Sequence, residues 1–376
     1  MRYITLSILL QFLLISPLFA SVDKSTVTAE QPTATSTVHS FLQNDAEPTF
    51  YGLASYYNNI NYFLVSADQI ERLIPGENYT LNSNRWLAAV KRLDTLVIQA
   101  DGLNFSLSDD ELLLTSVTSL DSPHAIVQVA NKDKLSSVAP ELDQIRYNHL
   151  WIGLAQISRA VEFSLVIIQS LVGNWGLAII LFALLLKVLL IPVGIMTTRF
   201  QRRVSQVQSA LEPKLNEIKS QYDGEEAHNR IMAAHKQLGV SPFYTLKPMI
   251  GMFIQIPILI ATFNALGEMP QFASQSFFWI TDLSLPDTIG ELPFTLPLFG
   301  STISILPVIM TVVTLFSTVI FQNTHASSGE MAKQKRNLYL MAAAFFILFY
   351  PFPAAMVLYW VMANILQTIQ QQIIKI

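Results

Sequence analysis

The chain has 376 residues, of which 51% are hydrophobic and only 13% are charged. This composition is typical of a membrane protein with several spans and a sizeable polar portion. The sequence contains no cysteine, which excludes disulfides, thiol catalysis, cysteine metal sites and a lipoprotein anchor. Its six histidines lie outside the apolar segments and form no pattern of metal ligands, so we expect no metal.

The N-terminal residues 1–20 have the features of a secretory signal peptide: a positive charge at Arg2, an apolar stretch over Ile4–Ile15 and a small residue at Ala20. A retained N-terminal anchor is the alternative, and either one predicts that the following residues are exported. Residues 21–40 are rich in Ser, Thr, Ala and Val and almost free of aromatic residues, which predicts a flexible tether.

Residues 41–147 have a mixed composition that predicts a small, β-rich, periplasmic domain. Expected strands lie at 95–99, 111–115 and 125–129, separated by turn residues. The segment 84–90 is read either as a short helix or as one more strand.

Residues 148–172 predict an amphipathic helix that lies in the membrane interface. Its apolar residues recur at helical spacing: Trp151, Leu154, Ile157, Val161, Leu165 and Ile168. Arg159 and Glu162 stand among them, and a helix packed against a domain would have the same pattern.

The remaining chain, 173–376, is mainly α-helical in prediction, with a five-helix transmembrane core and a cytoplasmic helical hairpin at 197–248. The five spans are expected at Gly176–Ile195, Met249–Leu266, Pro297–Phe321, Leu338–Tyr350 and Ala354–Ile374. The hairpin is expected as two polar helices separated by Asp223-Gly224.

Lys187 stands in the middle of the first span, roughly ten residues from either end. A charge at this depth costs several kcal/mol by contested scales, so it predicts a functional group with access to partners or water. Snorkelling to a headgroup is the alternative, and the depth of Lys187 argues against it.

Polar residues on other spans could provide partners for this lysine. Gln255 and Thr262 fall on one face of the second span, and Asn364, Gln367 and Gln371 follow at near-helical spacing in the fifth. Hydrogen bonding between helices is an equal explanation for any one of them.

Charge predicts the orientation of the spans. The 197–248 connection carries eight basic and five acidic residues, whereas residues 21–150 carry sixteen acidic and eight basic residues. The positive-inside rule places the hairpin and the C-terminus in the cytoplasm and residues 21–150 outside. Arg202, Arg203, Lys214 and Lys219 on the hairpin could meet ribosomal RNA, anionic lipid or a polypeptide, or form an ordinary solvated face.

Several motifs in one order resemble the YidC/Oxa family of membrane protein insertases. They are Gly173-Asn174-Trp175-Gly176, Leu211-Glu212-Pro213-Lys214, Ile254-Gln255-Ile256-Pro257, the Phe278–Ser284 stretch, and Val357–Trp360 continued through Asn364 to Gln370-Gln371-Gln372. Together they extend from about Val138 to the end of the chain.

The resemblance implies a hydrated groove that is open to the cytoplasm and to lipid, with Lys187 and Gln255 facing it. On this match we assign Thr262, Tyr359, Trp360 and Asn364 to the same groove. It further implies a membrane protein insertase and chaperone of the bacterial inner membrane, not an enzyme, that uses no nucleotide, metal or other cofactor. Its implied partners are nascent membrane proteins, membrane lipids, the Sec translocon and, through the hairpin, the ribosome, but not DNA.

Three features depart from the family pattern. Many bacterial members have arginine where this chain has Lys187, the exported domain is much smaller than in well-known relatives, and the chain ends at Lys375-Ile376 without a basic tail. A Sec-associated assembly factor without autonomous insertion remains an alternative. A transporter is less favoured because the spans show no internal repeat and no acidic residue to relay protons.

Overall fold

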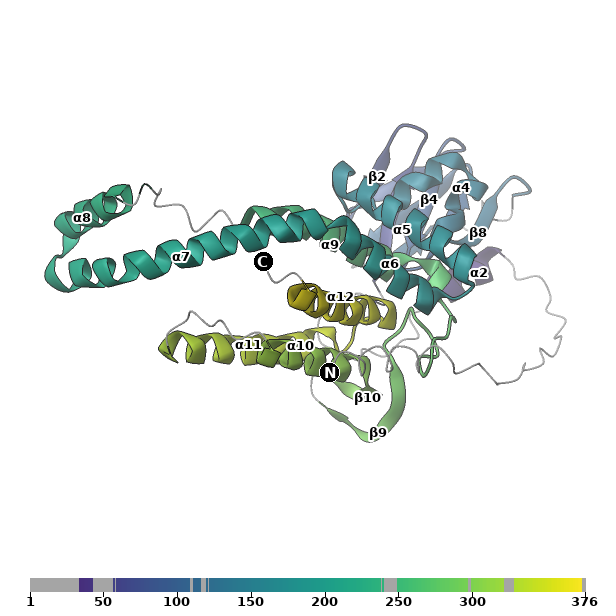
Figure 1. Cartoon of the computed structure of the whole chain (residues 1–376). Coiled ribbons are helices and arrows are strands. Elements are labelled where there is room, and N and C mark those ends of the chain that lie inside the picture. The colour runs from purple at the N-terminus through teal and green to yellow at the C-terminus, as the bar shows by residue number, and fades with distance from the viewer. Residues whose placement is uncertain are drawn as a thin grey trace.

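The computed structural model describes residues 34–42, 57, 59–108, 111–115, 120, 122–237, 239, 249–296, 299–320 and 328–373. It is mainly helical, with a β-rich N-terminal region, as predicted (Figure 1). We call residues 34–147 of this described chain the β domain and residues 152–373 the helical part. The predicted signal peptide or anchor over 1–20 lies outside the described residues.

The β domain contains two antiparallel sheets. A five-stranded sheet has the order β2-β1-β4-β5-β8, and a three-stranded sheet has the order β3-β6-β7. The strands are β1 Asn61–Val65, β2 Ile70–Arg72, β3 Asn78–Leu81, β4 Trp86–Val90, β5 Asp94–Gln99, β6 Leu103–Ser108, β7 Glu111–Leu114 and β8 Ile126–Asn131. The segment 84–90, read from sequence as helix or strand, therefore contains strand β4.

Apolar residues cover both faces of the five-stranded sheet. On one face, Leu96 and Ile98 pack with Phe105 of the three-stranded sheet. On the other face, Val97 packs with Leu142, which belongs to a short helical segment that follows β8. This segment consists of η2 Lys132–Lys134, α4 Leu135–Val138 and η3 Pro140–Ile145. Burial on both faces explains why β4 and β5 are apolar runs without alternation.

The tether predicted for residues 21–40 is wrong for its last part. Helix α2, Ala34–Leu42, packs on the β domain and buries Val38 and Phe41 in its core. These two residues lie one helical turn apart, so a short helix can bury both although most of the segment is small and polar. Residues 21–33 lie outside the described part.

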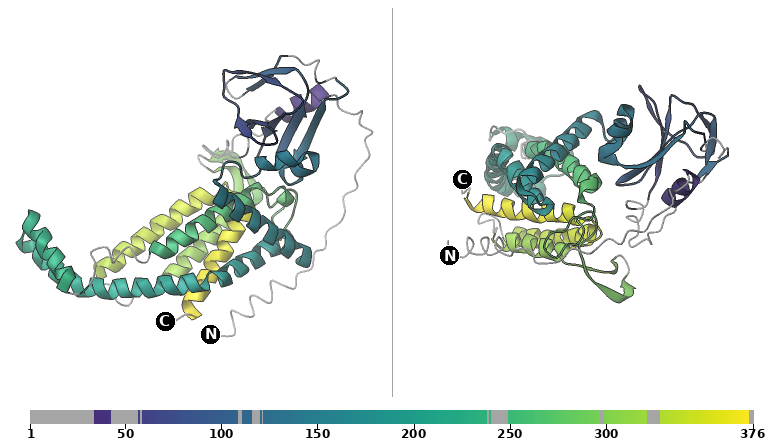
Figure 2. Two further views of the ribbon diagram at one scale, coloured as in Figure 1. Left: turned by 90° about the horizontal axis from the view of Figure 1, so that it is seen from above. Right: turned by 90° about the vertical axis from the view of Figure 1, so that its right-hand side faces the viewer.

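The helical part contains seven long helices among the described residues. They are α5 Ile152–Val172, α6 Trp175–Leu189, α7 Ile191–Gln221, α9 Met249–Glu268, α10 Leu306–Ile320, α11 Ser328–Phe349 and α12 Ala354–Ile373, and the shorter helix α8 spans Gly224–Gln237. The β domain and the α7–α8 hairpin lie at opposite ends of the molecule (Figures 1 and 2). We therefore refer to the β-domain end and the far end of the helices.

The span predicted over Gly176–Ile195 is not one straight helix. Helix α6 ends at Leu189, and α7 starts at Ile191 with its axis bent by 53°. Pro192 lacks a backbone N–H and its ring clashes with the carbonyl four residues earlier, which explains the break. Lys187 consequently lies in the last turn of α6 rather than in mid-helix.

The span predicted over Pro297–Phe321 begins later than expected. A two-stranded hairpin, β9 Thr288–Leu296 and β10 Gly300–Ser304, occupies the preceding residues, and α10 starts at Leu306. The apolar composition of this segment does not indicate that its first part contains strand β10, which pairs with β9. Conversely, α11 starts at Ser328, ten residues before the predicted start of the fourth span.

Length and apolar composition identify few complete spans in the described helices. Helix α5 alone is long and apolar enough to cross a membrane, and the bent pair of α6 with the first part of α7 makes a second candidate. Shorter apolar helices lie at Phe253–Glu268, Leu306–Ser317, Tyr339–Phe349 and Ala354–Gln370.

Candidate functional site

Lys187 and Gln367 bring α6 and α12 together through a polar contact. The Lys187 Nζ donates a hydrogen bond to Oε1 of Gln367. Lys187 is half-buried, and none of the described carboxylates forms an ion pair with it. Apolar residues surround its position on α6, including Leu184 and Val188, so the amide oxygen is its polar neighbour among the described side chains.

Gln367 was noticed in the sequence as one of the polar residues of the fifth span. On α12 it lies one turn after Asn364, which itself lies one turn after Trp360, so these three share one helix face. Asn364 is half-buried, and its carbonyl accepts a hydrogen bond from Thr368 Oγ1 at 2.9 Å. The side chain of Gln371, the next predicted member, lies outside the described part.

Thr262 and Tyr359 form a separate contact between α9 and α12. Thr262 is completely buried, its Oγ1 donates to the Ile258 carbonyl at 2.8 Å, and the side chain of Tyr359 lies beside it. The ring of Phe263 lies 6.2 Å from the Tyr359 ring and 5.5 Å from the Trp360 ring. These residues therefore belong to a tightly packed helix interface.

Gln255 is not brought to the other predicted residues. Its side chain is exposed on α9 and makes no hydrogen bond to another described residue. It lies two turns before Thr262 toward the far end of α9. The helices still approach closely there, because a Cβ on Gly251 would lie 1.8 Å from Oγ1 of Thr197 on α7.

The predicted basic residues of the hairpin, Arg202, Arg203, Lys214 and Lys219, are exposed on α7. None of them forms an ion pair with another residue in the described part of the chain. The α7–α8 hairpin is held by Leu211, which is completely buried against Ala234. Its basic face is therefore free of internal pairing and accessible.

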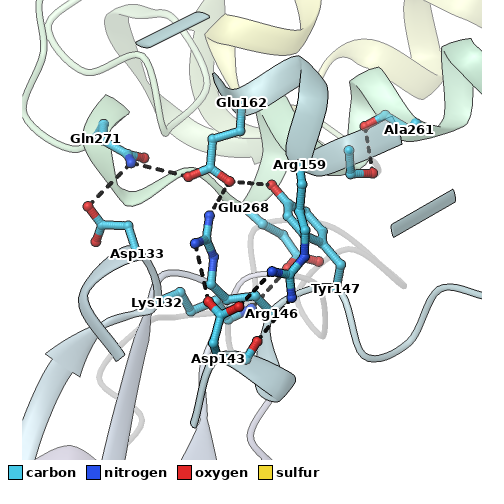
Figure 3. Close-up of polar contacts among 11 residues, drawn as sticks. Lys132, Asp133, Asp143, Arg146, Tyr147, Arg159, Glu162, Ala261, Glu268 and Gln271 are labelled. Atoms are coloured by element: carbon cyan, nitrogen blue, oxygen red, sulfur yellow. Dashed lines mark hydrogen bonds and ion pairs between the residues drawn. The ribbon is translucent and has the colours of Figure 1, made fainter. Parts of the chain in front are cut away.

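A second polar site joins the β domain to the helical part (Figure 3). Glu162 of α5, whose side chain is only 9% exposed, forms an ion pair with Arg146. The Tyr147 hydroxyl donates to Glu162 Oε2 at 3.0 Å, and Gln271 Nε2 donates to Oε1 at 3.3 Å. Burial and the neighbouring Glu162 carboxylate raise the pKa of Tyr147, so this hydroxyl remains a donor.

Further ion pairs extend this contact on both sides. Asp143 accepts from Arg159 at 2.6 Å and from Arg146 at 3.4 Å, while Lys132 pairs with Glu268 at 3.0 Å. We call the whole set the junction network: Lys132, Asp133, Asp143, Arg146, Tyr147, Arg159, Glu162, Glu268 and Gln271. It ties the short helical segment of the β domain to α5 and to the end of α9.

Sequence reasoning noticed Arg159 and Glu162 as charges in an apolar segment but did not find their partners. Glu162 and Gln271 are 109 residues apart, and Lys132 and Glu268 are 136 apart. Local periodicity carries no information about pairs at such separations. A charge that interrupts an apolar helix face was nevertheless a correct signal of a specific partner.

Another residue that sequence reasoning missed is Asp287, which is 2% exposed. It accepts the backbone N–H groups of Ile305 at 2.9 Å and Leu306 at 2.7 Å, and the Trp279 indole N–H at 3.2 Å. Burial raises the pKa of Asp287, although these hydrogen bonds act in the opposite direction. The carboxylate thus caps the start of α10 from the preceding loop.

Comparison with known proteins gives the chain its family. Residues 167–376, more than half of the chain, match the family model described as 60Kd inner membrane protein. A membrane protein insertase YidC from Treponema denticola is 30% identical over 59% of this chain and 38% of its own length. The YidC insertase of Saccharophagus degradans is 28% identical over 92% of this chain and 61% of its own length.

This chain therefore spans less than two thirds of the length of these relatives. A solved structure of an active YidC insertase with its first transmembrane domain resolved covers 83% of both chains at 17% identity and a TM-score of 0.39, a likeness on which we base no conclusion. The family model and the motifs in the sequence agree over the same region of the chain. The chain belongs to the 60Kd inner membrane protein family.

Proposed function

We propose that this protein inserts membrane proteins into the bacterial inner membrane and assists their folding, through a hydrophilic groove that opens to the cytoplasm. The observation that carries the proposal is the Lys187–Gln367 contact between α6 and α12, in a chain of this family. A charged side chain among lipid-facing apolar residues costs free energy, so its presence in such a segment indicates a functional role. The five spans of the proposed core are α6 with the start of α7, α9, α10, α11 and α12.

In this proposal the polar tail of a nascent protein enters the groove while its apolar segment moves into lipid. Each unsatisfied backbone group of a polar segment costs several kcal/mol in hydrocarbon. A hydrated groove lowers this free-energy barrier to crossing the membrane. Lys187 attracts acidic residues of the passenger, and salt screens this interaction less than at the surface. Each large aliphatic residue gains about 0.3–0.6 kcal/mol at the bilayer centre, so insertion needs no nucleotide.

Lys187 faces the groove in this proposal, with Gln255 and Asn364, whereas Thr262, Tyr359 and Trp360 lie behind it in the packed interface of α9 and α12. Because Thr262 and Tyr359 are both buried between α9 and α12, we assign this pair to helix packing rather than to direct contact with substrate. The exposed side chain of Gln255 supports its place on the groove wall.

The proposed topology places the β domain in the periplasm, α5 in the outer membrane interface, and the α7–α8 hairpin in the cytoplasm. The exposed apolar face of α5, which includes Phe163 and Leu171, supports its contact with lipid. The unpaired basic face of α7 supports a contact with an anionic partner, such as nascent chain, lipid or ribosome. A Sec translocon is a further proposed partner.

Reconstitution tests the proposal directly. Purified protein in liposomes receives a short single-span substrate with an acidic tail, without ATP, and protease protection of the tail measures insertion. We expect wild type and Lys187→Arg to insert the substrate, Lys187→Ala to be impaired and Lys187→Glu to be impaired most, because the charge attracts the tail.

Unchanged insertion by Lys187→Ala would remove the role of Lys187. A wild-type protein that inserts nothing alone but does so with the translocon added would favour an assembly factor. A substrate with a neutral tail serves as the control, because its insertion is expected to depend much less on the charge at this position.

A further inference from the structure

The β9–β10 hairpin exposes several large apolar side chains. Ile289 is 48% exposed, Phe294 58% and Ile303 36%. Its two strands pair only with one another among the described strands, so both edges are open. Two-stranded hairpins are marginal in water, and open apolar edges promote association. The exposed side chains therefore need a further surface that covers them.

The hairpin is held firmly against the β-domain end of α11. The Tyr350 hydroxyl donates to the Thr302 carbonyl at 2.7 Å and accepts from the Ser304 N–H at 3.3 Å. The ring of Phe299, between the two strands, lies 4.8 Å from the Tyr350 ring and 5.8 Å from that of Phe346. Figure 1 shows β9 and β10 curling beyond the ends of α10 and α11. The apolar side chains of the hairpin are thus presented in a fixed position.

The exposed side chains continue an apolar face of α10. Val308, Val312 and Phe316 are 46%, 59% and 63% exposed and follow one another at four-residue spacing, so they share one helix face. Strand β10 leads into α10 within two residues. In the proposed function this helix crosses the membrane, and the hairpin lies at its outer end.

Charge favours lipid over a charged protein surface as the partner. Residues 288–304 contain no Lys or Arg, and Glu291 is their one charged residue. Open strand edges expose N–H and C=O groups that hydrocarbon cannot satisfy, and an ionised Glu291 would be costly there too. Headgroups and interfacial water can satisfy both, while the exposed ring of Phe294 can reach the upper acyl chains.

We propose that the β9–β10 hairpin lies in the outer headgroup and acyl-chain boundary beside α10 and α11, and contacts lipid there. This inference rests on the proposed function, which places α10 across the membrane. The hairpin would then hold the outer ends of α10 and α11 at a fixed depth while the groove works on the cytoplasmic side.

The absence of cysteine from the sequence allows a clean test, because each introduced cysteine is a unique labelling site. Phe294→Cys and Ile289→Cys carry a nitroxide spin label in full-length protein, in vesicles of phosphatidylethanolamine and phosphatidylglycerol. Collision with apolar oxygen and with a polar nickel chelate is measured by electron paramagnetic resonance. Val312→Cys provides the lipid reference, and Leu113→Cys, 51% exposed on β7, provides the aqueous reference.

We expect the oxygen-to-nickel accessibility ratio at Phe294 and Ile289 to be shifted clearly above that at Leu113 and to stay below that at Val312. A ratio equal to that at Leu113, with Val312 in lipid, would overturn the hairpin proposal alone. Labels inaccessible to both reagents would also overturn it, because a protein partner or second copy would cover the hairpin. An aqueous Val312 would overturn the membrane placement of α10, and the proposed function with it.

Discussion

The junction network predicts that the buried carboxylate of Glu162 contributes strongly to holding the β domain on the helices. The substitution Glu162→Gln keeps the volume of the side chain and removes its charge. Arg146, which is 19% exposed, then loses its closest anion and retains only Asp143 at 3.4 Å. Breaking a buried ion pair costs about 3–5 kcal/mol, and the remaining contact with Asp143 favours the lower end, about 3 kcal/mol.

Hydrogen exchange of the full-length protein in detergent measures this loss locally. Amides of η3 and of the first turns of α5 should exchange through an opening that separates the β domain from the helices. A loss of about 3 kcal/mol corresponds to exchange about 100-fold faster, because each 1.4 kcal/mol is a factor of ten. Amides in the middle of the five-stranded sheet should be unaffected.

The chain offers a matched control in the exposed pair of Arg230 and Glu226 on α8. These side chains lie 2.9 Å apart but are 48% and 62% exposed, so Glu226→Gln should cost no more than about 1 kcal/mol. If Glu162→Gln accelerates exchange no more than Glu226→Gln does in α8, burial does not strengthen the Glu162 pair and the reasoning is refuted. A double-mutant cycle with Arg146→Gln would separate the pair from the contacts of Glu162 with other donors.

Substitutions at three other positions test the packing and electrostatics of the helical part. Asp287→Ala leaves two N–H groups at the start of α10 without a cap and should lower the free energy of unfolding by about 2 kcal/mol. Asp287→Asn keeps an acceptor and should lower it less. Thermal unfolding in detergent measures both. Because burial raises the pKa of Asp287, its pH-dependent contribution to stability is largest below the ordinary value of 3.8 and is lost as pH rises through the folded pKa; Asp287→Asn should remove this slope. Gly176→Ala would place a Cβ 2.1 Å from Cγ of Phe277 and should cost about 1–3 kcal/mol in the same assay, and an unchanged melting temperature would contradict this close approach. In Gln367→Glu the new carboxylate would pair with Lys187 and compete with acidic passengers. Insertion of an acidic-tailed substrate should therefore slow several-fold, whereas insertion of a neutral-tailed substrate should change little. Equal effects on both substrates would argue against a charge-based role of Lys187.

The sequence predicted elements well where the pattern was strong and local. The strands expected at 95–99 and 111–115 are present as β5 and β7, and the helix expected at 354–374 is present as α12. Strand β10 was missed because its residues fall in the apolar stretch that was read as the start of the third span, and β9 lies in the stretch before it that was read as a loop. The break between α6 and α7 follows from Pro192, whereas apolar composition, which continues across the break, does not indicate it.

The candidate site was predictable only in part, for a similar reason. A lysine in an apolar segment is visible without any structure, and one of the polar residues noted in the fifth span, Gln367, contacts Lys187. Which of several polar residues would meet it depended on the axial positions of α6 and α12, which no local pattern contains. The junction network joins side chains 15 or 16 residues apart with others 109 and 136 residues apart. Neither kind of pairing follows from helix or strand periodicity, so only the charges of the network could be noticed.

The structure connects the two polar sites through helix α9. Its β-domain end is held by the junction network through Glu268 and by a 2.8 Å contact between Asn264 and His149. Thr262, within the next turn, joins α9 to Tyr359 of α12, and Gln255 follows two turns farther along. The start of α12 is fixed in turn, because the backbone N–H groups of its first two residues donate to carbonyls of the 283–285 loop at 2.8 and 3.0 Å. With the β-domain ends of both helices held in this way, separation of α9 from α12 is least costly at their far ends. The proposed groove therefore opens most easily at the far end, which the proposed topology places on the cytoplasmic side.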